Sequence, residues 1–186
     1  MRKLLIILPL CAAATLSVAT YWKLSQPLLS LPRQGLRAPI PPPIAWYRPA
    51  AAPHFQSGER IGEIEVPRLK LSVPVYEGDD TAVLNRGAGH VPGTALPGNE
   101  GNICIAAHRD KFFRALRFIK PHDEVVLQTS NGVERFQVDA TKIVKPTDTQ
   151  VLMPAPHRDL TLVTCYPFFH VGPAPDRFIV HAEKVG

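Results

Sequence analysis

The chain has 186 residues, which leaves room for at most one domain of ordinary size once two unusual N-terminal segments are set aside. Its formal net charge is +5, but the basic residues are scattered and form no run of five or six. This distribution argues against nucleic acid as a partner, and it is typical of a solvated basic surface.

The first 23 residues have the pattern of an N-terminal transmembrane helix. Arg2 and Lys3 precede nineteen residues without a formal charge, from Leu4 to Trp22, and Lys23 follows. Such a run is just long enough to cross a bilayer, and the leading basic residues place that end in the cytoplasm. A cleaved signal peptide and a lipoprotein signal ending at Cys11 are alternatives, although Leu10 fits a lipidation signal poorly. All three interpretations predict that the rest of the chain is exported.

Residues 24–57 form a proline-rich linker. The stretch from Pro27 to Pro53 holds eight prolines and no acidic residue, which favours an extended polyproline-type spacer. At about 3.1 Å per residue it could reach roughly 80 Å. The pentapeptide LPRQG, Leu31 to Gly35, resembles a sorting signal, and either chance composition or a decoy that occupies the substrate groove explains it.

Residues 58–186 consist of short β-type runs separated by Gly, Pro and Asn-Gly. Asn131-Gly132 is suited to a type I′ hairpin turn, and only Asp110 to Ile119 has helical spacing, with Phe112, Phe113 and Leu116 on one side. Many short strands with one or two helical turns predict a mainly β protein with a closed or nearly closed barrel. The expected strands lie within residues 61–69, 71–78, 101–108, 123–144, 160–165 and 176–183.

Cys165 ends one of these runs, in the segment TLVTCYPF. Strand alternation puts Thr161, Val163 and Cys165 on one face. Cysteine is often a small buried core residue. Here, however, Pro167 cannot continue a central ladder, so Cys165 should lie at a strand end, where active-site groups are commonly exposed.

A disulfide between Cys104 and Cys165 is the alternative, because an exported domain permits one. If His108 serves as the base for Cys165, then Cys104, four residues earlier on the same strand, lies about 13 Å away. Disulfide formation needs Cα atoms within about 7 Å, so the two interpretations exclude each other. A buried Cys104 is the simpler expectation.

His108 and Arg177 are the other candidates for chemistry. His108 ends the apolar run GNICIAAH, and Arg177 opens the run RFIV, twelve residues after Cys165. Either residue alone has an ordinary structural explanation, and Arg177 could pair with Asp176 or Asp110. No metal-ligand spacing and no phosphate-binding loop occurs, so we expect neither a metal nor a cofactor.

At this point the sequence resembles the sortases, which are membrane-anchored cysteine transpeptidases, and it looks most like their class D. The resemblance covers Gly58 to the C-terminus. It rests on GHVPGTALPGNEGNICIAAHRDKFFRAL, on LTLVTCYPFFHVGPAPDRFIV and on the order His, Cys, Arg. The family usually has Gly at the position of Ala107.

The resemblance implies an eight-stranded sortase barrel in which Cys165 is the nucleophile, His108 the general acid and base, and Arg177 the cation that holds substrate and stabilises the oxyanion. Thr164 is a weaker candidate for substrate contact. The implied substrates are exported proteins with a C-terminal LPXTG-like sorting signal. The implied acceptor is an amine of a wall precursor or a protein lysine. An exported thiol hydrolase or protease and a non-catalytic membrane-anchored binding module are the alternatives.

Overall fold

The computed structural model describes residues 55–186. The predicted transmembrane helix over residues 1–23, nearly all of the predicted linker and the LPRQG pentapeptide lie outside the described residues. Within residues 55–186, no helix is both long enough and apolar enough to cross a membrane.

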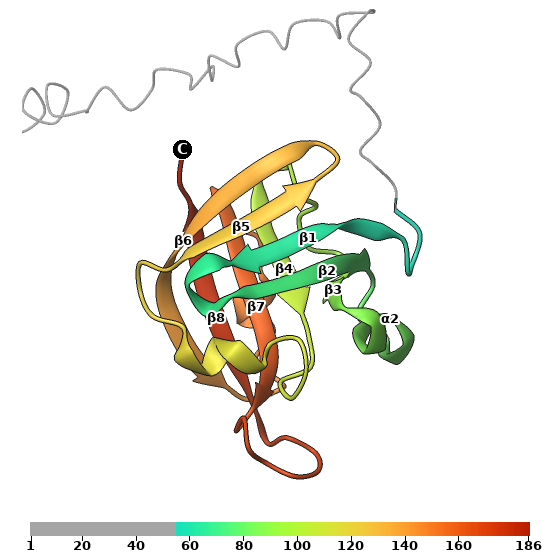
Figure 1. Cartoon of the computed structure of the whole chain (residues 1–186), viewed down its shortest axis with the longest axis vertical. Coiled ribbons are helices and arrows are strands. Elements are labelled where there is room, and N and C mark those ends of the chain that lie inside the picture. Colours follow the sequence, from blue (N-terminus) through green and yellow to red (C-terminus); the bar gives the residue numbers. More distant parts are fainter. Residues whose placement is uncertain (1–54) are drawn as a thin grey trace, which may run out of the picture. The chain divides into compact units, whose positions relative to one another are not determined.

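Eight strands close into a barrel, as predicted (Figure 1). Around the barrel the order is β1-β2-β3-β4-β7-β8-β6-β5, and β1 closes it by pairing with both β2 and β5. The β2–β3 and β4–β7 pairs are parallel, and the other pairs are antiparallel. The strands are β1 (Arg60–Val66), β2 (Leu71–Glu77), β3 (Ala88–His90), β4 (Gly101–Ala106), β5 (Glu124–Thr129), β6 (Gly132–Val144), β7 (Arg158–Tyr166) and β8 (Asp176–Lys184).

The barrel interior is a single apolar core. Ile103 and Ile105 of β4 and Leu160 and Leu162 of β7 are fully buried in it. Since side chains alternate along a strand, the residues between these four point away from the core, towards the outer face of the sheet. On β7 this outer set is Thr161, Val163 and Cys165, which matches the alternation expected from the sequence.

Four short helices join the strands: η1 (Pro67–Leu69), α2 (Thr81–Arg86), η2 (Arg114–Phe118) and η3 (Thr149–Leu152). The helical segment expected over Asp110 to Ile119 is shorter than its spacing suggested, because only η2 is helical and it is a 3-10 helix. Its apolar side is still buried, with Phe113 and Leu116 fully inaccessible. Helix α2 was not predicted, although its N-cap, Asp80, accepts hydrogen bonds from the amides of Ala82 and Val83.

The β5–β6 hairpin is confirmed, but its turn lies one residue earlier than expected. Thr129 pairs with Gly132, so the two turn residues are Ser130 and Asn131. Gly132 opens β6 with a φ of +129°, a conformation that favours glycine. The glycine is therefore used beside the turn rather than within it.

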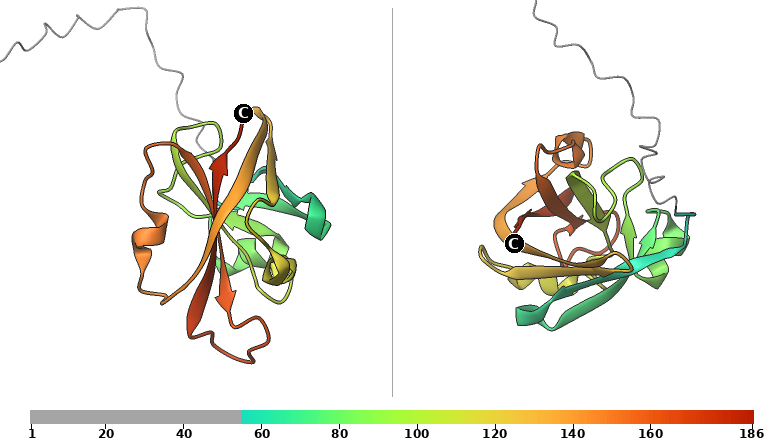
Figure 2. Two further views of the ribbon diagram at one scale, coloured as in Figure 1. Left: turned by 90° about the vertical axis from the view of Figure 1, so that its left-hand side faces the viewer. Right: turned by 90° about the horizontal axis from the view of Figure 1, so that it is seen from above.

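Two loops frame the end of the β7 strand. Residues 145–157, the β6–β7 loop, carry η3 along the side of the barrel, and residues 167–175, the β7–β8 loop, extend beyond its end (Figures 1 and 2). The C-terminus lies at the opposite end of the barrel from the β7–β8 loop.

Candidate active site

The strand register brings Cys165, His108 and Arg177 together. Cys165 on β7 pairs directly with Arg177 on β8. On its other side, β4 pairs with β7 with Ala106 opposite Val163, and the amide of Ala107 continues this ladder by donating to the carbonyl of Val163 at 3.1 Å. His108 lies two residues beyond Ala106, just past the end of β4, and Cys165 lies two residues beyond Val163, so both residues lie at this end of the β4–β7 pair. Directly paired residues on antiparallel strands have Cβ atoms about 4.5–5.5 Å apart, so the side chains of Cys165 and Arg177 are neighbours on one face of the sheet.

These three residues line one cavity of about 390 Å³. Outward-facing residues of the sheet form its floor, among them Val163 and Ile179, and the β6–β7 loop forms one wall with Val151 and Leu152. Asp79, Leu84 and Val91 also line the cavity. His108 and Cys165 are both half-buried, so each is reachable from this cavity. The cavity is large enough to take part of an extended peptide beside the thiol.

Arg177 does not form the surface ion pair that its sequence context allowed. The carboxylate of Asp176 is instead bound to Lys145, with Nζ and Oδ1 2.6 Å apart. The Nη1 atom of Arg177 donates to the carbonyls of Asp176 at 3.0 Å and Ala174 at 3.4 Å. Neutral carbonyls orient the guanidinium, and no carboxylate among residues 55–186 forms an ion pair with it. Its positive charge is therefore available to a developing negative charge in the cavity.

Thr164 borders the cavity, but its side chain is buried on the other face of β7 from Cys165. Its hydroxyl donates to the carbonyl of Ala107 at 2.7 Å, which ties β7 to the residue just before His108. The predicted substrate contact of Thr164 stays a prediction. Ala107 is buried without a positive φ, so the backbone accepts alanine where the family usually has glycine.

Cys104 and Cys165 are both free, and the disulfide alternative is wrong for this structure. Cys104 pairs with Thr161, four residues before Cys165 on β7, as the sequence argument required. It is fully inaccessible, and burial raises the pKa of the Cys104 thiol to about 11. Because the thiolate is the reactive form of cysteine, Cys104 is poorly suited to be a nucleophile.

Sequence reasoning missed the side chains that support the β7–β8 loop. Arg109, next to His108, donates from Nη2 to the carbonyls of His170 at 2.6 Å and Gly172 at 3.0 Å. At the base of the loop, Tyr166, Phe168 and Phe178 form an aromatic cluster with ring centroids 5.3–6.3 Å apart, in which Tyr166 stacks on Phe178 and Phe168 meets both rings edge to face. The polar corner His-Arg-Asp and the aromatic-rich YPFF segment were the available signals. The carbonyls that Arg109 contacts are 61 and 63 residues away along the chain, so only the fold reveals this contact.

Residues 55–186 contain no group of three or more His, Cys, Asp or Glu side chains arranged to hold a metal ion. The polar groups that line the cavity include the thiol, imidazole and guanidinium described above, together with Asp79, Asp148 and Lys145.

A thiol, an imidazole and a guanidinium that line one cavity of a closed barrel are the kinds of group that a cysteine-nucleophile enzyme needs. Comparisons with known proteins agree: the family model described as "Sortase domain" matches residues 64–185. Sortase D of Bacillus subtilis (strain 168) is 34% identical over 131 residues, which cover 70% of this chain and 66% of that protein. Sortase A of Streptococcus agalactiae serotype III (strain NEM316) is 29% identical over 133 residues, with 66% and 52% covered. The matched segment thus spans between about half and two thirds of these relatives.

Solved structures give the same result. The structure described as a Clostridium perfringens Sortase D5 transpeptidase superposes with a TM-score of 0.65 at 28% sequence identity, covering 72% of this chain and 83% of that one. This chain belongs to the sortase family. The two class D relatives support the resemblance to that class seen in the sequence.

Proposed function

We propose that this protein is a cysteine transpeptidase that cleaves an LPXTG-like sorting signal between Thr and Gly and transfers the cleaved protein to an amine. The observation that carries this proposal is the single cavity that His108, Cys165 and Arg177 line together, with Arg177 paired directly to Cys165 across β7 and β8. Family membership supports the reaction class.

In the first half of the reaction, the thiolate of Cys165 attacks the Thr carbonyl carbon and forms a tetrahedral intermediate. Arg177, which has no carboxylate partner among the described residues, stabilises the oxyanion. His108, as the imidazolium, gives its proton to the departing Gly amine, and the C–N bond breaks. The product is a thioester between Cys165 and the Thr acyl group, with the Gly-containing peptide released.

In the second half, an incoming amine attacks the thioester carbonyl. His108, now neutral, takes a proton from that amine, Arg177 again stabilises the oxyanion, and the thiolate of Cys165 leaves. A new amide joins the substrate protein to the acceptor, and the enzyme returns to its starting protonation state. The acceptor would be an amine of a wall precursor or a protein lysine.

We also infer that the barrel works outside the cytoplasm, attached to the cell membrane through the helix predicted over residues 1–23. The charge pattern around Leu4 to Trp22 supports this topology. The proline-rich linker would hold the site away from the bilayer, where exported substrates and wall precursors are found.

Mass spectrometry of the full-length protein, incubated with an LPXTG peptide and then with triglycine, tests the proposal. We expect a thioacyl adduct on Cys165 that converts to the peptide ligated to triglycine. Cys165→Ala and His108→Ala should abolish this product, whereas the matched control Cys104→Ala should retain it. An adduct that yields only hydrolysed peptide despite the amine would identify a thiol hydrolase. Peptide binding without any adduct would identify a binding module.

A further inference from the structure

Asn102 is a buried polar residue that the proposed reaction does not use. It is the second residue of β4 and only 5% exposed. Because Ile103 and Ile105 face the barrel core, Asn102 faces the outer surface of the sheet, on the same side as Cys104. This is the surface over which the β6–β7 loop passes.

All hydrogen-bonding groups of the Asn102 side chain point to specific partners. Its Nδ2 donates to the carbonyl of Val151 at 3.1 Å and to that of Met153 at 3.3 Å. Its Oδ1 accepts from the hydroxyl of Thr161 at 2.8 Å, which fixes the orientation of the amide. A buried amide satisfied in this way holds its partners in one arrangement.

The two carbonyls flank Leu152, the last residue of η3, and Val151 and Leu152 line the wall of the active-site cavity. The loop is otherwise tied to the barrel near its two ends. Lys145 pairs with Asp176, and the amide of Gly101 donates to the carbonyl of His157 at 3.2 Å. Between residues 147 and 155, the bonds from Asn102 are the hydrogen bonds that connect the described loop to the barrel.

We propose that Asn102 is a positioning residue for substrate binding: it holds η3 against the barrel so that the Val151 and Leu152 wall of the cavity is formed before the peptide arrives. This inference rests on the proposed function. A preformed wall lowers the ordering cost of binding, so losing it should weaken peptide binding. Asn102 does not line the cavity, so the chemistry at Cys165 should continue.

The test uses the full-length double variant Asn102→Leu/Thr161→Val, because Asn102→Leu alone would also leave the buried hydroxyl of Thr161 without its acceptor. Thr161→Val alone is the matched control, since it keeps the Asn102 amide group that donates to the carbonyls of Val151 and Met153. Asn102→Ala provides a second variant if the double variant folds poorly. Steady-state transpeptidation, hydrogen exchange of the amides in residues 147–155, and the rate of Cys165 alkylation by iodoacetamide are measured for each.

For the double variant we expect faster exchange in residues 147–155, a KM for the LPXTG peptide raised about five- to tenfold, a kcat within about twofold, and an unchanged alkylation rate. Thr161→Val should behave like the unaltered protein in all four measurements. Unchanged loop exchange, or an unchanged KM despite faster exchange, would overturn the inference. If the unaltered protein forms no acyl adduct at all, the proposed function fails instead, and the two failures are therefore distinguishable.

Discussion

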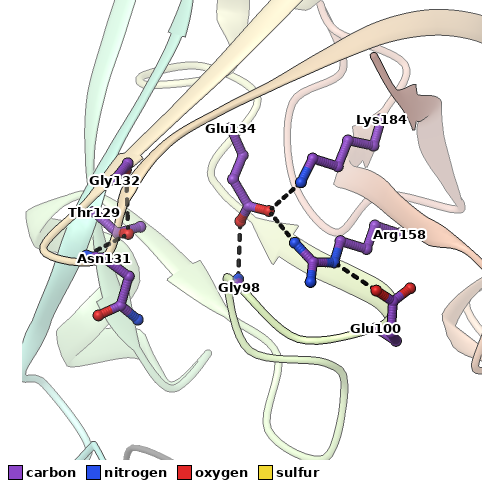
Figure 3. A network of polar contacts seen from close by, with 8 residues as sticks. All are labelled: Gly98, Glu100, Thr129, Asn131, Gly132, Glu134, Arg158 and Lys184. Carbon is purple, nitrogen blue, oxygen red and sulfur yellow. Dashed lines mark hydrogen bonds and ion pairs between the residues drawn. The ribbon is translucent and has the colours of Figure 1, made fainter. Parts of the chain in front are cut away.

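The two ends of the β7–β8 ladder differ in how they treat their arginines, Arg158 at one end and Arg177 at the other. At the end where β7 begins and β8 finishes, every charged side chain in Figure 3 has an ionic partner. Glu134 lies at the centre of this terminal network: it contacts Arg158 at 3.4 Å and Lys184 at 3.3 Å and accepts from the amide of Gly98 at 2.8 Å. Arg158 also donates to Glu100 at 2.9 Å.

At the other end of the same ladder Asp176 pairs with Lys145, whereas the guanidinium of Arg177, beside Cys165, forms its hydrogen bonds within residues 55–186 to neutral carbonyls. A charge satisfied within the fold contributes to stability, whereas a charge left without a counter-ion beside a cavity can interact with substrate. The difference predicts that substitutions at the terminal network change stability and that substitutions at the Cys165 end change activity.

The largest expected effect is on catalysis, from Arg177→Met. Removing the cation opposite Cys165 should lower kcat/KM by about 10²–10³-fold, because a preorganised oxyanion-stabilising group typically contributes that much. Urea denaturation should show a change of less than about 1 kcal/mol in the free energy of unfolding, since the lost hydrogen bonds go to partly exposed carbonyls. Arg177→Lys keeps the positive charge but not the planar, forked guanidinium, so its kcat/KM should lie between those of the original protein and of Arg177→Met. Full activity in Arg177→Met would remove Arg177 from the reaction.

The next effect should appear only in stability, from Glu134→Gln. The glutamine amide keeps the shape of the Glu134 side chain but removes the negative charge that Arg158 and Lys184 contact. The Glu134 side chain is only 11% exposed, so solvent replaces this charge poorly. We expect a loss of about 1–2 kcal/mol in the free energy of unfolding, measured by urea denaturation, and a kcat/KM within about twofold of the original.

Glu124→Gln on the neighbouring strand is the matched control for the terminal network. Its carboxylate pairs with Arg135 at 2.6 Å, but both side chains are about half exposed, at 45% and 56%. Such a surface pair contributes about 0–1 kcal/mol, so this variant should be nearly as stable as the original. Equal losses in the two variants, or a large loss of activity in Glu134→Gln, would contradict the proposed division between the two ends.

Features encoded by local sequence were predicted correctly. The strands containing Cys165 and Arg177 were found because β-branched runs end at Pro and Gly signals, and a buried Cys104 was expected because strand geometry separates it from a catalytic Cys165. The barrel followed from the number of short strands. Helix α2 and strand β3 were missed because six and three residues carry too little periodicity, although Asp80 was a readable cap.

Features that depend on distant contacts were not predictable. Nothing near Asn102 in the sequence indicates that its amide meets the carbonyls of Val151 and Met153, which are 49 and 51 residues away. The terminal network is similar, since Glu134 meets Arg158 only because β6, β7 and β8 finish or begin at the same end of the barrel. The roles of Cys165, His108 and Arg177 were available only because the sequence resembles a family with a known order of catalytic residues.

The smallest expected effect concerns Cys104, which pairs with Thr161 in the middle of β7, between the two ends compared above. Its thiol is fully buried, whereas that of Cys165 is reachable from the cavity. The pKa of the Cys104 thiol rises from 9.0 to about 11 in the folded protein because burial disfavours the thiolate. Well below pH 9 the thiol is protonated in both folded and unfolded chains. As the pH rises from 9 towards 11, the unfolded chain ionises first, so the free energy of unfolding falls, by about 1 kcal/mol at pH 10.

Urea denaturation of the original protein and of Cys104→Ala from pH 7 to pH 10.5 measures this difference, because the other ionisable groups are common to both. The gap in stability between the two proteins should narrow above pH 9, since only the original protein contains the raised thiol. Two parallel curves would show that Cys104 ionises equally easily in both states, contrary to its complete burial. In the same samples at pH 8, iodoacetamide should label Cys165 in the folded protein and reach Cys104 only after unfolding, because a thiol without access or thiolate character is unreactive.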